Sequence, residues 1–200
     1  MPPLRLEFVG DGVRDAATVP CLVEGILSCT VEVLRTDHWA RLHRSAGSRY
    51  GRKLDYAVRR CADAADGVVA TVDCDAEDRG VRLAELDAGR EHARETRPIP
   101  IAIGEARPNA DAWLLDDAEA VKTALGLSAQ HKVPAVGRNC KETIDQLRDE
   151  AGQTDTASLT AIARLVEERR SRDPKSTGFA AFADDVRRVL GPLMEPAADD

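Results

Sequence analysis

The sequence predicts an α/β protein with a mostly parallel sheet and helices on both faces, followed by a C-terminal helical extension. Two observations predict this class. Up to about residue 109, short apolar runs alternate with stretches whose apolar residues recur at helical spacing. An order in which strands alternate with helices favours parallel pairing of the strands. From residue 110 onward, the periodicity is helical throughout.

The first elements lie on either side of a glycine-rich turn. Residues 4–9 form an apolar run that predicts a strand, and Gly10-Asp-Gly12 predicts a tight turn. Residues 15–27 predict a helix, because their apolar side chains return at helical spacing. Residues 28–34 then predict the second strand.

The rest of the sheet follows a basic segment that contains two glycines. In chain order, the sequence predicts a loop over 35–52, a helix over 53–65, a strand over 67–72, a polar helix over 79–95 and a short strand over 99–103. Pro98 ends the polar helix, because proline removes a backbone donor and restricts the residue before it. Residues 1–109 are therefore expected to form the α/β core.

The second half of the chain is expected to pack on this core as helices. They are predicted at residues 111–125, 141–150, 156–170 and 177–190, within a helical extension that spans 110–191. Gly126 and Gly152 separate successive helices. Residues 192–200 are small and acidic, and we expect a disordered tail there.

Composition and charge narrow the functional classes. The chain has 200 residues, 43% of them hydrophobic, and a net charge of −7. This charge argues against a protein that coats nucleic acid nonspecifically. No apolar run approaches the roughly 20 residues of a membrane helix, so we expect a cytoplasmic protein without a membrane partner. The five cysteines are widely scattered and indicate neither a disulfide framework nor a zinc site.

One segment has the opposite charge to the whole. Residues 35–60 hold eight basic residues against two acids, with Trp39, Tyr50 and Tyr56 between them. Arg49, Arg52 and Lys53 are candidates for contacts with nucleic-acid phosphates, and the aromatic residues are candidates for base stacking. The alternative is a solvated loop and helix face.

Carboxylates follow two of the predicted strands. Asp11 and Asp15 follow the first strand, and Asp73 and Asp75 follow the third. The carboxyl ends of parallel strands share one edge of the sheet, so these acids are expected to converge. Hard oxygen ligands of this kind suit Mg²⁺ or Mn²⁺. Taken singly, each acid has a structural alternative: Asp11 as a turn residue, Asp15 as a helix cap, and Asp78 as a cap of the next helix.

Two of these motifs resemble a known family. Gly10-Asp-Gly-Val-Arg-Asp15 resembles the Glu-Gly-x-x-Asp/Glu motif of TOPRIM domains, with Asp11 in place of the usual glutamate, and Val72-Asp-Cys-Asp75 resembles their Asp-x-Asp motif. Four shorter motifs resemble a bacterial TOPRIM-like family of unknown function, often encoded beside ATPases in genome-defence loci: Lys53-Leu54, Asp111-Ala-Trp-Leu-Leu115, Cys140-Lys-Glu142 and Ser176-Thr-Gly-Phe-Ala-Ala-Phe182.

The resemblance implies a TOPRIM/Rossmann-like sheet and divalent-metal phosphodiester chemistry. One or two Mg²⁺ or Mn²⁺ ions would be held by Asp11, Asp73 and Asp75, with Asp15 in support and Asp111 as a further acid. Lys141 would neutralise charge that develops on the phosphate. The implied protein is a Mg²⁺-dependent nuclease acting on DNA or RNA, the effector subunit of an anti-phage system with an AAA- or ABC-type ATPase partner. A homo-oligomer is compatible with this role.

Alternatives remain open at this point. Because Asp11 is one methylene shorter than glutamate, the chain could be a catalytically degenerate TOPRIM-like scaffold or sensor that docks on an ATPase. Asp111 could cap a helix while Trp113 packs in the core, with Glu105, on the loop after the fourth strand, a weaker substitute as the further acid. A haloacid-dehalogenase phosphatase also uses Asp-x-Asp, but its motif is N-terminal, and Glu77 stands where that family has threonine or valine.

Overall fold

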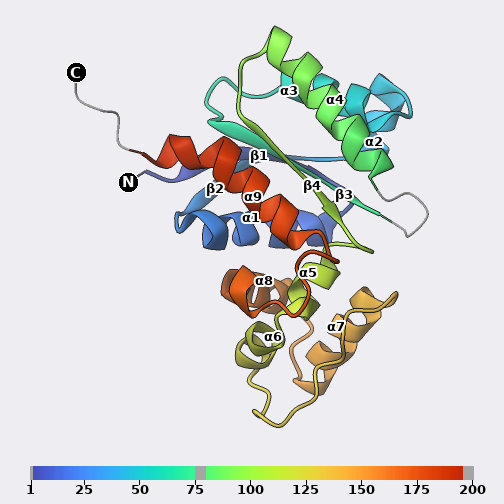
Figure 1. Ribbon diagram of the computed structural model, residues 1–200, viewed down its shortest axis with the longest axis vertical. Helices are drawn as coiled ribbons and strands as arrows, with labels where there is room; N and C mark the ends of the chain where they lie inside the picture. The colour runs from blue at the N-terminus through green and yellow to red at the C-terminus, as the bar shows by residue number, and fades with distance from the viewer. Residues whose placement is uncertain (1, 75–79, 196–200) are drawn as a thin grey trace.

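A computed structural model describes residues 2–74 and 80–195 of the chain. These residues form a four-stranded, all-parallel sheet with the strand order β2-β1-β3-β4 (Figure 1). The strands are β1 (Leu4–Gly10), β2 (Val31–His38), β3 (Gly67–Asp73) and β4 (Ile101–Ala106). The predicted α/β class with a parallel sheet is therefore confirmed, and the architecture is Rossmann-like.

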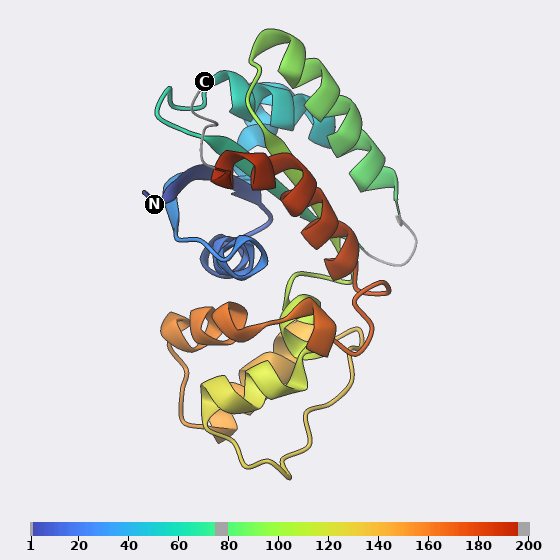
Figure 2. The same cartoon turned by 60° about the vertical axis from the view of Figure 1, so that its left-hand side comes forward.

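Helices cover both faces of this sheet. One face packs against α1 (Val13–Leu27) and α9 (Phe179–Leu190), and the other against α2 (Trp39–Ala46), α3 (Tyr50–Arg59) and α4 (Val81–Thr96) (Figures 1 and 2). The side chains of a strand alternate between the two faces. Leu4, Leu6 and Phe8 accordingly belong to the α1 side, whereas Val68, Ala70 and Val72 belong to the α3 side.

The remaining helices form a lobe beside α1, below the sheet in Figure 1. They are α5 (Asp111–Asp116), α6 (Ala118–Leu125), α7 (Cys140–Glu150) and α8 (Thr156–Leu165), with a short 3₁₀ helix at Glu168–Arg170. Their apolar side chains belong to the same core as α1 and α9. The predicted extension thus divides into a lobe and a last helix, α9, which returns to the sheet.

Trp113 joins the lobe to α9. Its ring stacks on Phe182 with centroids 4.8 Å apart, and its Nε1 donates a 2.8 Å hydrogen bond to the Thr177 carbonyl. Phe182 in turn lies against Gly104 of β4, where a Cβ atom would come within 2.5 Å of the phenyl ring. Glycine at this position therefore allows α9 to pack closely on the sheet.

Two predicted boundaries in the sheet were wrong. The second strand covers Val31–His38 rather than 28–34, because Ser28 adopts a left-handed conformation with φ of 53° and ends α1. β2 is an edge strand, where polar residues are tolerated, and its last residues look like a loop in the sequence. The fourth strand covers Ile101–Ala106 rather than 99–103, so it includes the polar residue Glu105.

The predicted helices also needed correction. The basic segment is not a loop: α2 occupies Trp39–Ala46, and α3 begins at Tyr50 and ends at Arg59. The helix expected over 111–125 breaks at Asp117, whose side chain caps α6 by accepting from the Ala120 amide. The helix expected over 156–170 ends at Leu165.

The disordered tail predicted over residues 192–200 was wrong at its start. Gly191–Met194 forms a 3₁₀ helix, so residues 192–194 are ordered, and residues 196–200 lie outside the described part of the chain. Within the described ranges, no helix is long and apolar enough to cross a membrane.

Candidate metal centre

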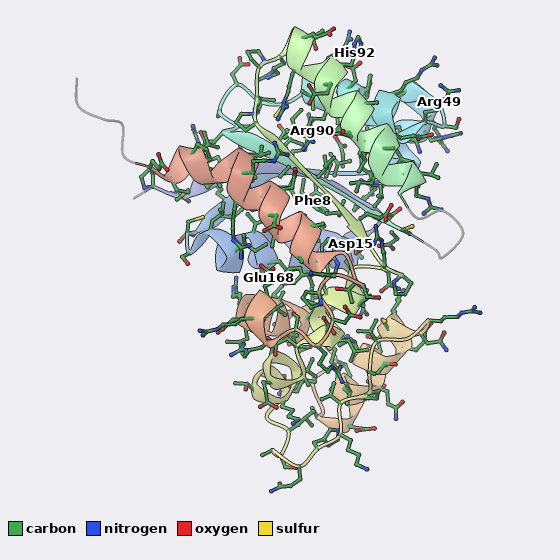
Figure 3. The ribbon with its side chains drawn as sticks, viewed as in Figure 1. Phe8, Asp15, Arg49, Arg90, His92 and Glu168 are labelled. Carbon is green, nitrogen blue, oxygen red and sulfur yellow. The ribbon has the colours of Figure 1, made fainter. Side chains whose placement is uncertain are left out.

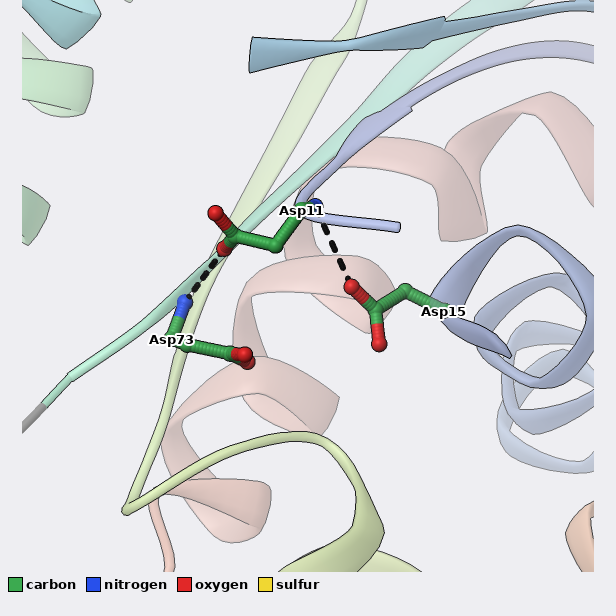
Figure 4. A group of neighbouring side chains, drawn as sticks. All are labelled: Asp11, Asp15 and Asp73. Carbon is green, nitrogen blue, oxygen red and sulfur yellow. Dashed lines mark hydrogen bonds between the residues drawn. The ribbon is translucent and has the colours of Figure 1, made fainter. Parts of the chain in front are cut away.

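Three carboxylates meet at the carboxyl edge of the sheet. Asp11 directly follows β1, Asp15 lies in the first turn of α1, and Asp73 is the last residue of β3. Each offers one oxygen atom, and the three atoms lie within 4.8 Å of one another (Figure 4). The chain passes from β1 to β2 on one side and returns to β3 on the other, so the group lies at the topological switch point, where ligands bind in open α/β sheets.

Backbone amides hold these carboxylates in place. The Asp73 amide donates a 2.8 Å hydrogen bond to Oδ2 of Asp11, and the amides of Asp11 and Gly12 both donate to Oδ2 of Asp15 at 3.1 Å (Figure 4). The Ala110 amide donates to Oδ1 of Asp73 at 3.3 Å. Within the described residues, the second oxygen of each carboxylate accepts no hydrogen bond, so each acid retains an oxygen for a ligand.

Gly10, at the end of β1, leaves room for the carboxylates to lie close together. A Cβ atom on Gly10 would lie 2.5 Å from the phenyl ring of Phe8 and 3.4 Å from Cβ of Asp15. Any larger residue would therefore displace either the buried phenyl ring or the first turn of α1. The glycine before Asp11 allows strand, turn and helix to come together at the carboxylates.

Burial and mutual repulsion disfavour the charged forms. Loss of hydration, followed by the neighbouring charge of Asp11, raises the pKa of Asp15 to about 6. Loss of hydration, followed by the charges of Asp15 and Asp11, raises the pKa of Asp73 to about 8. The pKa of Asp11 is also raised by loss of hydration, against the opposing charges of Arg82 and Lys53. Such a group is stabilised by protons or by a cation that neutralises it.

Basic and aromatic side chains border the same site. Lys53 is buried in α3, with its Nζ 4.8 Å from the centre of the Tyr50 ring. Arg82, near the start of α4, lies 5.8 Å from the same ring centre and donates a 2.5 Å hydrogen bond to the Asp73 carbonyl. Sequence reasoning missed Arg82. The sequence feature that could have indicated Arg82 is its position as the arginine in the first turn of the helix after the Asp-x-Asp motif.

Asp111 and Lys141 lie beside the group rather than in it. Asp111 is buried at the start of α5 and accepts a 2.5 Å hydrogen bond from Arg14, which also pairs with Asp145 at 2.7 Å. Its charge contributes to the raised pKa values of Asp15 and Asp73. Lys141 is exposed on α7, and its charge acts on the pKa of Asp111. Arg14, inside the Gly-x-x-Asp motif, was not singled out from the sequence.

Two other predicted residues fall elsewhere. Asp75 lies outside the described residues. Glu105 is not on a loop: it is buried within β4, where it pairs with Arg107 at 2.6 Å and accepts a 2.9 Å hydrogen bond from the Gly80 amide. Its carboxylate therefore neutralises Arg107 and anchors the residue that precedes α4.

In the basic segment, residues 35–60, Arg49 and Arg52 are exposed, whereas Trp39 is buried. Arg49 and Arg52 are exposed and border a surface groove of about 630 Å³ between α3 and α4, and Figure 3 shows Arg49 on the outer side of this helical layer. Within the described residues, five arginines of this segment form no ion pair: Arg41, Arg44, Arg49, Arg52 and Arg60. Trp39 is buried and donates a 2.7 Å hydrogen bond to the Thr71 carbonyl, so its predicted availability for base stacking was wrong.

Together, the fold and this site define a Rossmann-like α/β protein with a carboxylate cluster at the switch point of its sheet. Comparisons of the chain with protein-family models, with curated proteins and with solved structures gave no match.

Proposed function

We propose that this protein is a metal-dependent nuclease in which Asp11, Asp15 and Asp73 hold Mg²⁺ or Mn²⁺. The observation that carries the proposal is the meeting of these carboxylates, which come from the residue after β1, the first turn of α1 and the end of β3; Asp11 and Asp73 are 62 residues apart along the chain. Three oxygen ligands with raised pKa values form a donor set that suits a hard divalent cation. Asp75 is included as a further ligand on the strength of the TOPRIM resemblance alone.

The surroundings of the site favour a phosphodiester as substrate. When bound, a divalent ion or ion pair supplies water activation and stabilisation of the leaving oxygen. Lys53 and Arg82 add positive charge beside the carboxylates. The arginines of the basic segment that form no ion pair with any described residue offer contacts for the backbone of DNA or RNA in an otherwise acidic protein.

The wider role extends this proposal. The resemblance to TOPRIM-like proteins encoded beside ATPases supports an effector subunit in anti-phage defence, working in the cytoplasm with an AAA- or ABC-type ATPase.

A cleavage assay tests the nuclease. Purified protein is incubated with supercoiled plasmid, single-stranded DNA or RNA, with Mn²⁺, Mg²⁺ or EDTA. We expect cleavage that requires metal and is abolished by Asp73→Asn, which keeps the size of the side chain but removes its charge. Asp149→Asn, an exposed residue of α7, is the matched control and should cleave like the wild type. Equal cleavage by Asp73→Asn would overturn the proposal.

A second candidate is a noncatalytic scaffold or sensor that docks on an ATPase. The observation that favours it is the use of Asp11 as a link between strands, because its Oδ2 accepts the Asp73 amide. Measurements of metal binding and of cleavage together distinguish the two candidates. Binding of Mn²⁺ without cleavage of any nucleic acid, also in the presence of the ATPase, would favour the scaffold.

A further inference from the structure

The side chain of Lys53 is mostly buried, which is unusual for lysine, while its Nζ keeps access to solvent. The residue is only 6% exposed and lies on the inward face of α3 with Leu54, Ala57 and Val58. Lysine is almost never buried in this way without a partner for its ammonium group. Among the described residues, no carboxylate pairs with Lys53 Nζ and no oxygen accepts a hydrogen bond from it. The ammonium instead lies over the face of the Tyr50 ring, 4.8 Å from its centre.

The position of Lys53 points to the carboxylate site. Tyr50 is in contact with Trp39, which directly follows β2, with ring centroids 5.3 Å apart, so this end of α3 lies at the carboxyl edge of the sheet. The same Tyr50 ring contacts Arg82, whose guanidinium donates to the Asp73 carbonyl. A chain of direct contacts thus leads from Lys53 to a member of the cluster, and the charge of Lys53 acts on Asp11.

The ammonium has the donors that a phosphate group needs. It can donate three hydrogen bonds, and none is used within the described part of the chain. Neutralisation by Asp11 does not explain the burial, because the two groups form no ion pair within 4.0 Å. Contacts with Lys53, Arg82 and Trp39 occupy the Tyr50 ring, which argues against base stacking there. These features favour a ligand recognised through its phosphate and not through its base.

We propose that Lys53 is the phosphate-binding residue of this site, donating to a non-bridging oxygen of a phosphate ester that also faces Asp11, Asp15 and Asp73. The inference deepens the proposed function and rests on it for the identity of the ester, a nucleic-acid phosphate. It transfers to Lys53 the charge-neutralising role that the resemblance assigned to Lys141. Because the contact is with phosphate, binding is independent of the base.

The test uses thymidine 5′-phosphate as the probe. Its affinity is measured by calorimetry with saturating Mn²⁺ for the wild type and for Lys53→Met. Lys132→Met is the control, because Lys132 is exposed and lies 79 residues from Lys53 along the chain. We expect Lys53→Met to weaken binding by about ten-fold or more, as for the loss of a hydrogen bond to a charged group. Mn²⁺ affinity should stay equal or rise, since a nearby positive charge is removed. Lys132→Met should match the wild type, and adenosine 5′-phosphate should bind like the thymidine compound.

Each outcome decides the inference. Wild-type affinity in a folded Lys53→Met variant would overturn it, as would failure of the wild type to bind the probe. If Lys53→Met does not fold, Lys53→Gln replaces it, and the ¹³C signal of the Lys53 ε-carbon must shift when the probe binds to the wild type. Probe binding through Lys53 without cleavage of nucleic acid would defeat the nuclease and leave this inference standing. Metal-dependent cleavage with unchanged KM in Lys53→Met would support the nuclease and overturn the role of Lys53.

Discussion

The backbone amide of Asp73 donates a 2.8 Å hydrogen bond to the carboxylate of Asp11. This bond joins the last residue of β3 to the residue that follows β1, whose own amide donates to Asp15 (Figure 4). The Asp11 carboxylate also offers an oxygen within 4.8 Å of oxygens of Asp15 and Asp73. Asp11 therefore has two roles that substitution can separate: an acceptor that holds the strand ends together, and a charge available to a cation.

Asp11→Asn keeps the acceptor and removes the charge. We expect its Mn²⁺ affinity to fall at least about ten-fold while its melting temperature without metal stays equal or rises, because one repelling carboxylate is gone. Asp11→Ala removes both features and should also lower the stability of the metal-free protein. Calorimetric titration and thermal melting provide the two measurements. Equal Mn²⁺ affinity in Asp11→Asn and wild type would remove Asp11 from the metal site.

The stability of the metal-free protein should fall as the pH rises. Asp15 and Asp73 have pKa values raised from 3.8 to about 6 and about 8, so their contribution is fully present below pH 3.8 and is lost as the pH rises through those values. Between pH 6 and 8, Asp73 alone should cost on the order of 1 kcal/mol per pH unit. Urea unfolding in EDTA measures this slope. Asp73→Asn should flatten it, and Mn²⁺ should reverse the loss at pH 8.

Gly10→Ala should destabilise the fold. The added methyl group would lie 2.5 Å from the buried ring of Phe8, and overpacking of this kind costs about 1–3 kcal/mol. Gly137→Ala is the matched control, because a Cβ there meets no atom within 4 Å. Urea unfolding of both variants compares them directly. A loss of stability as large in Gly137→Ala as in Gly10→Ala would contradict the packing argument.

Arg14→Met should lower the stability of the fold, because it leaves a buried acid unpaired. Arg14 pairs with the buried Asp111 and with Asp145, so its removal leaves Asp111 without its cation and should cost about 3 kcal/mol. The double variant Arg14→Met/Asp111→Asn should recover at least about 1 kcal/mol of that loss. Denaturant unfolding of both single variants and the double variant provides the cycle. Simple additivity would show that Arg14 acts through other contacts.

Arg49→Ser/Arg52→Ser should weaken nucleic-acid binding without any metal. Affinity for a fluorescent single-stranded DNA is measured in EDTA across a range of salt concentrations. The slope of log affinity against log salt should become shallower by about 0.7 for each phosphate that the variant no longer neutralises. Arg164→Ser/Arg169→Ser, which removes two exposed arginines that are ion-paired, is the control. An unchanged slope in the first pair would exclude this groove from the nucleic-acid path.

The sheet and the convergence of its acids could be predicted because both depend on local patterns. Apolar runs indicated the strands, and parallel strands bring Asp11 and Asp73 to one edge whatever the details of the loops. Helix breaks were harder. Asp117 caps α6 by accepting from the nearby Ala120 amide. Its other carboxylate oxygen accepts from the distant Glu167 amide and from Arg170, and nothing near Asp117 in the sequence indicates those partners.

Partners from distant segments were also hidden. Arg14 looks like an ordinary polar residue of a surface helix, and its role follows from the positions of Asp111 and Asp145, about 100 and 130 residues away. Lys53 was recognisable as basic, but its burial depends on how α3 packs in the fold, where α3 lies close against α4. There, Gly51 and Gly89 come so close that a Cβ on either would lie 2.5 Å from the opposite backbone.

The return of α9 to the sheet has a consequence for the order of synthesis. Asp11, Asp15 and Asp73 leave the ribosome well before Phe179–Leu190, the helix that covers β4 through Phe182 and Gly104. Until that helix is made, the face of β4 that packs against α9 is uncovered, and β4 is the neighbour of β3 in the sheet. The sheet that carries the carboxylate cluster is thus completed by a helix that is translated after all three of the carboxylates.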